Sequence, residues 1–68
     1  MPKKYHKPRV GISMSADAES IRRLVLRTLH QSGRQYQHDK FKRQSDGIED
    51  RDRMVSLAAY YVDLVHYS

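Results

Sequence analysis

Residues 9–33 have the sequence RVGISMSADAESIRRLVLRTLHQSG, in which a two-residue alternation is followed by a helical period. Along residues 9–14 apolar side chains alternate with polar or small ones, which is typical of a strand with one buried face. Along residues 16–32 apolar side chains recur every three or four positions, and Gly33 follows where a helix commonly ends in the left-handed conformation. This stretch therefore predicts a short strand followed by an amphipathic helix.

A second helix is predicted to begin near residue 47 and to run toward His66. Asp46 and Glu49 precede it with the spacing of a capping box. Its apolar side chains spread over more than half of the helix circumference, which is more than one partner helix can cover. The predicted strand also lacks a clean alternating partner in the chain, and unpaired strand groups are costly. We therefore expect a homodimer with these interface residues: Val10, Ile12, Met54, Leu57, Ala58, Tyr61, Leu64 and Val65.

Between the two predicted helices, residues 34–45 (RQYQHDKFKRQS) follow neither the strand period nor the helix period. We interpret them as a long basic loop with local helix at most. Residues 1–8 are predicted to be a flexible basic arm, and residues 9–68 a single small helical domain. The expected fold class is thus mainly α with a short N-terminal strand, in which two amphipathic helices are joined by a long basic loop and dimerisation completes the core.

Composition excludes several classes of function. The 68-residue chain has no Cys, and no two of its four His are three or four positions apart, so we expect no metal site and no cofactor. It has no nucleophile motif and no Gly-rich phosphate loop, so we expect no enzymatic activity. No segment approaches the roughly 20 apolar residues that span a bilayer, so we expect a cytoplasmic protein without a membrane partner.

Positive charge is concentrated in the front of the chain. Residues 1–45 carry 11 of the 13 Lys and Arg and three acids, whereas residues 46–68 carry two Arg and five acids. Such a basic segment attracts polyanions, and nucleic acid is the commonest of them. Tyr36 and Phe41 lie among the cations, where each could stack on a base or join the core. The candidate nucleic-acid-binding residues are Lys3, Lys4, Lys7, Arg9, Ser13, Arg23, Arg27, Arg34, Lys40, Lys42 and Arg43.

The order of a basic alternating strand, an amphipathic helix and a second apolar helix resembles the ribbon-helix-helix family of DNA-binding dimers. Arg9, Gly11 and Ser13 would occupy the groove-facing positions of the strand. The resemblance implies that two copies pair their strands antiparallel and insert this ribbon into the major groove of DNA.

Three interpretations remain open from the sequence, and the third of them is a subunit of a larger assembly in which the second helix completes the core of another chain. The first is a dimeric DNA-binding regulator of transcription or of a mobile element, with duplex DNA as the favoured partner and a steep salt dependence of binding. The second is a compact protein-interaction module, an inhibitor or adaptor whose basic face docks on an acidic protein surface. A basic surface alone does not distinguish these partners.

Overall fold

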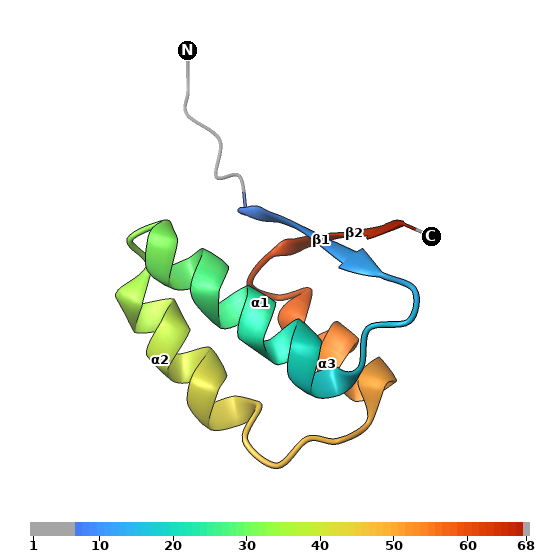
Figure 1. Cartoon of the computed structure of the whole chain (residues 1–68). Coiled ribbons are helices and arrows are strands. Elements are labelled where there is room, and N and C mark those ends of the chain that lie inside the picture. Colours follow the sequence, from blue (N-terminus) through green and yellow to red (C-terminus); the bar gives the residue numbers. More distant parts are fainter. Residues whose placement is uncertain (1–6, 68) are drawn as a thin grey trace.

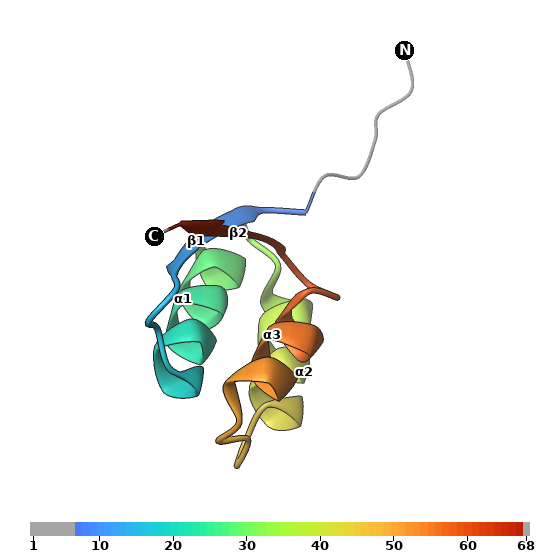
Figure 2. The ribbon, with the colours of Figure 1, turned by 90° about the vertical axis from the view of Figure 1, so that its right-hand side faces the viewer.

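The computed structural model of this protein describes residues 7–67. In chain order its elements are β1 (Arg9–Ser13), α1 (Ala18–Gln31), α2 (Gln35–Gln44), α3 (Arg51–Ala58) and β2 (Asp63–Tyr67). β1 and β2 pair in parallel, with Arg9 opposite Asp63 and Ser13 opposite Tyr67. The three helices lie on one side of this two-stranded sheet, and no described element covers its other side (Figures 1 and 2).

α1 is the central helix, and the strand and helix predicted from residues 9–33 are confirmed. Its buried side chains follow the expected spacing of three and four and contact β1, α2 and α3; they are Ala18, Ile21, Val25 and Leu29. The helix begins at Asp17, whose carboxylate accepts a hydrogen bond of 2.9 Å from the backbone N–H of Ser20. Gly33, at φ 73°, lets the chain reverse directly into α2.

The long basic loop predicted for residues 34–45 is wrong, because residues 35–44 form α2. Phe41 is the only buried residue of this helix, and its ring meets the ring of Tyr61 edge-on at 5.4 Å. A helix that buries one apolar side chain shows no repeating apolar period, so the periodicity that reveals α1 is absent here. The chain therefore has three helices in its described part instead of two.

The second predicted helix is also too long. α3 begins after Asp50, whose carboxylate accepts a hydrogen bond of 3.1 Å from the backbone N–H of Arg53, and it ends at Ala58. After a turn, residues 63–67 (DLVHY) form β2. Three helices separate the two strands, a connection long enough for parallel pairing.

The pairing of β1 with β2 differs from the expected one. The ribbon-helix-helix resemblance implies antiparallel pairing between two copies, whereas β1 pairs in parallel within its own chain. The unpaired strand was one reason to expect a homodimer, and the structure removes it. Dimerisation itself stays a prediction.

Most residues expected at a dimer interface lie inside the single chain instead. Five belong to its core: Val10, Ile12, Met54, Ala58 and Tyr61. Leu57 and Leu64 are half-buried, and only Val65 is exposed, at 43%. One chain therefore buries most of the apolar arc that predicted an intermolecular core.

The basic arm is only partly within the described residues, and Lys3 and Lys4 lie outside them. Lys7 donates a hydrogen bond of 2.8 Å from Nζ to the carbonyl of Ala59. The carbonyl of Pro8 accepts a 2.8 Å bond from the backbone N–H of Asp63. These two bonds connect the residues before β1 to the turn before β2.

None of the helices between residues 7 and 67 combines the length and the apolar character needed to cross a bilayer.

Candidate nucleic-acid interface

α2 presents a cationic outer surface. Phe41 is the one residue of this helix that is fully buried, and Lys40, Lys42 and Arg43 are all exposed. Within residues 7–67 neither Lys40 nor Lys42 forms an ion pair. Their ammonium groups are therefore available to an external anion.

The one acidic residue of α2 is Asp39. A hydrogen bond from the His38 side chain lowers the pKa of the Asp39 carboxyl below its usual value, and Gln35 donates a second bond of 3.0 Å. The carboxylate is thus ionised near neutral pH and already has two donors. It offsets part of the positive charge of Arg43, which also favours its ionised form.

α1 adds two further cations on its exposed side. Arg27 is exposed and makes no ion pair within the described residues. Arg23 pairs with Glu19 at 3.0 Å, but both side chains are about three-quarters exposed. Such pairs are weak in water, so Arg23 can exchange its partner for a phosphate at little cost. Arg34 is half-buried at the residue that precedes α2.

Arg22 joins the two helices. Its Nε donates to the hydroxyl of the buried Ser45 at 2.7 Å, and its Nη2 donates to the carbonyl of Lys42 at 3.1 Å. α1 and α2 consequently lie side by side in opposite directions (Figure 1). A shallow depression of about 460 Å³ separates them, lined by Arg22, Asp39, Lys42, Arg43 and Asp46. The structure therefore brings Lys42 and Arg43 of α2 next to Arg22 of α1, whereas Arg23 and Arg27 line a separate depression with Ser20 and Leu24.

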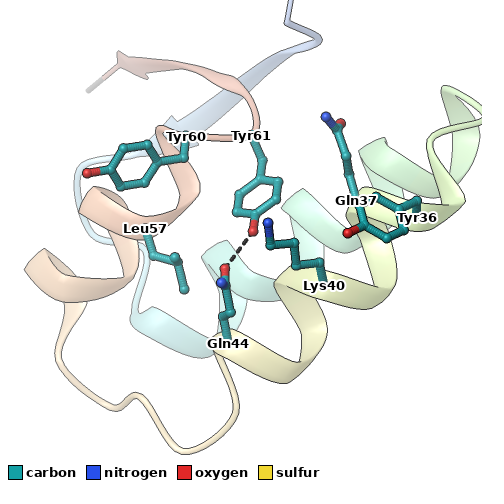
Figure 3. A pocket seen from close by; sticks show the side chains of 7 residues that line it. All are labelled: Tyr36, Gln37, Lys40, Gln44, Leu57, Tyr60 and Tyr61. Atoms are coloured by element: carbon teal, nitrogen blue, oxygen red, sulfur yellow. Dashed lines mark hydrogen bonds between the residues drawn. The ribbon is translucent and has the colours of Figure 1, made fainter.

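On its other side α2 borders an open groove. α2 and α3 both contact α1, and between them lies a space of about 450 Å³ (Figure 3). Tyr36 and Tyr60 stand on opposite sides of it, exposed by 76% and 77%. The complete lining is Tyr36, Gln37, Lys40, Gln44, Leu57, Tyr60 and Tyr61. We refer to it as the tyrosine groove.

The sequence patterns do not indicate this groove. Tyr60 and Leu57 fall in the segment predicted as one continuous helix, and Gln44 in the segment predicted as a loop. The sequence feature that could have indicated the groove is the Tyr60–Tyr61 pair directly after the last helical turn, because both residues line it. One of the two rings is buried while the other is exposed.

The candidates on the sheet lie apart from α2 in both ribbon views (Figures 1 and 2). Arg9 is 81% exposed, and its Nε lies 3.9 Å from a carboxylate oxygen of Asp63 on β2. The hydroxyl of Ser13 accepts a hydrogen bond of 3.2 Å from the backbone N–H of Ser15, so it stabilises the turn after β1. An acid next to Arg9 weakens the attraction of this strand for phosphate.

Within residues 7–67 no group of three or more His, Cys, Asp or Glu is arranged to hold a metal ion. Comparisons with protein-family models, with curated proteins and with solved structures gave no match to this chain.

Proposed function

We propose that this protein binds nucleic acid through α2 and the exposed side of α1, with duplex DNA as the favoured partner and a regulatory role that depends on this binding. The observation that supports the proposal best is the composition of α2. This helix exposes Lys40, Lys42 and Arg43 and carries a single acid that already has donors. Exposed cations without ion pairs release bound counterions from phosphates at no cost of breaking an internal contact.

The distribution of acids supports the same surface. Most acidic residues lie at or near the starts of α1 and α3 or in the segment before α3: Asp17, Glu19, Asp46, Glu49, Asp50 and Asp52. The half-buried Arg51 brings the two helix starts together, because its Nε donates to the carbonyl of Ala16 at 2.7 Å. Five of these acids lie at or next to a helix start, where the dipole favours them, whereas Asp46 follows the end of α2 and lines the depression with Asp39, Lys42 and Arg43. On α2 itself the three exposed cations outnumber Asp39.

Binding should be measured by fluorescence anisotropy with a labelled duplex and the matching single strand, at about 50 and about 200 mM salt. The variants are Arg27→Gln, Lys42→Gln and Arg43→Gln. Arg53→Gln is the matched control, since it removes the same charge from an exposed position on α3. Each interface variant should lower the salt slope by about 0.9 per lost duplex phosphate contact, and Arg53→Gln should not.

Two results contradict the proposal. If the wild-type chain binds no nucleic acid at the lower salt concentration, the protein-interaction module becomes the better interpretation. If Arg53→Gln weakens binding as much as the other three variants, only net charge matters and α2 has no special role.

A further inference from the structure

We propose that the tyrosine groove binds unpaired bases, so that the protein holds a single-stranded nucleic-acid segment across α2 and α3. The inference rests on the proposed nucleic-acid binding and adds the single strand as a second form of nucleic acid beside the duplex. It does not follow from the cations, which attract the phosphates of duplexes and single strands alike.

The two exposed rings are the first argument. Tyr36 and Tyr60 expose about three-quarters of their surface and flank the groove, as Figure 3 shows. Neither ring has a ring partner within residues 7–67, where the aromatic contacts are those of His30 with His38 and of Phe41 with Tyr61. A flat, solvent-exposed phenol is a stacking surface for any base, because every base has a π-face.

Charge is the second argument. Lys40 is the single charged residue in the lining, and no carboxylate lies there. Lys40 and Arg43 are three positions apart on α2, so their side chains share one side of the helix. A strand that stacks its bases in the groove can therefore place its phosphates along this side of α2. The absence of a lining carboxylate disfavours a basic peptide.

The third argument is a fixed hydrogen-bond donor. The hydroxyl of the buried Tyr61 donates to Oε1 of Gln44 at 2.5 Å. This bond orients the amide and leaves Nε2 of Gln44 without a described acceptor. A base carbonyl or ring nitrogen is such an acceptor. The groove volume of about 450 Å³ falls within the roughly 300–1,000 Å³ of small-ligand sites.

The test uses Tyr36→Ala and Tyr60→Ala, each matched by the Phe variant that keeps the ring. Affinity for a short single strand and for its duplex is measured by anisotropy at one salt concentration, and thermal unfolding checks that each variant folds. Each Ala variant should weaken single-strand binding by about 5- to 100-fold, since one stacking surface is lost. Duplex affinity should stay within about 2-fold of wild type. The Phe variants should bind both forms like wild type.

Three outcomes overturn the inference. Folded Ala variants that bind the single strand like wild type show that the rings do not stack on bases. Equal loss of single-strand and duplex affinity shows that the groove contacts nucleic acid without distinguishing unpaired bases. A wild-type chain that binds duplex with the expected charge dependence but binds no single strand leaves the proposed function intact and assigns the groove to another partner, such as a protein segment. If the proposed function itself is wrong, the wild-type chain binds neither the duplex nor the single strand, and this result is distinct from the three outcomes above.

Discussion

Replacing Phe41 with Leu tests the placement of α2, the element that sequence patterns did not reveal. Phe41 is fully buried, is the only buried residue of its helix, and meets Tyr61 edge-on at 5.4 Å and 67°. Complete truncation of a buried Phe to Ala costs about 3–5 kcal/mol. Leu keeps part of the apolar volume but loses the aromatic pair, worth about 0.5–1.5 kcal/mol, so we expect a total loss of roughly 1–2 kcal/mol.

This loss is large for a small chain. At roughly 0.05–0.15 kcal/mol per residue, a 68-residue domain has a free energy of unfolding of about 3–10 kcal/mol. The Ala variant would remove about a third of that free energy or more, whereas the Leu variant stays folded and measurable. With a urea slope of about 1 kcal/mol per molar, Phe41→Leu should lower the midpoint by roughly 1–2 M in far-UV circular dichroism.

The matched control is Tyr36→Leu, which removes an aromatic ring from the same helix at a position that is 76% exposed. Its effect on the free energy of unfolding should stay within about 0.5 kcal/mol. If the two variants shift the urea midpoint equally, Phe41 does not anchor a packed helix, and the loop predicted from the sequence would describe residues 34–45 better.

Three further predictions concern stability and assembly. Arg51→Ala should lower the free energy of unfolding by about 1–3 kcal/mol in urea titrations, because the carbonyl of Ala16 loses its side-chain donor and the carbonyl of Ser13 keeps only the bond from the backbone N–H of Ala16. Arg53→Ala should change the free energy of unfolding by less than about 0.5 kcal/mol. The N–H of Ser20 lowers the pKa of Asp17, so this carboxylate stabilises the fold above its unfolded-state pKa of 3.8, and that stabilisation is lost as pH falls through the lower folded-state pKa. Asp17→Asn should therefore flatten the acid limb of the urea midpoint measured from about pH 5 to about pH 2, and an unchanged limb would contradict this assignment. If the chain forms a homodimer, Val65→Asp on the uncovered side of the sheet should shift sedimentation toward the monomer without unfolding it; a wild-type monomer at micromolar concentration would rule out the dimer.

Several charged residues show the limit of sequence-based interpretation. Nothing in the sequence distinguishes the environments of Arg22, Arg27 and Arg51. In the structure Arg27 is exposed, whereas Arg22 and Arg51 are half-buried. Arg22 and Arg51 donate to a hydroxyl or to backbone carbonyls far away in the chain. Whether a guanidinium contacts solvent or the fold depends on which backbone lies beside it, and that is a property of the packed chain.

β1 and α1 can be predicted from the amino-acid order alone, because both bury one face and the period of their apolar residues records that burial locally. The same holds for the basic front of the chain, since charge needs no structure to be counted. The helix of residues 35–44 becomes visible in the packed chain, because its one buried side chain, Phe41, leaves no apolar period. The tertiary structure also decided that DLVHY (residues 63–67) is a strand, because a short apolar segment satisfies either geometry until a partner strand supplies its hydrogen bonds. That partner strand, β1, lies more than fifty residues earlier in the chain. The tyrosine groove likewise depends on the packed fold, because it is the space left between α2 and α3 where both lie against α1.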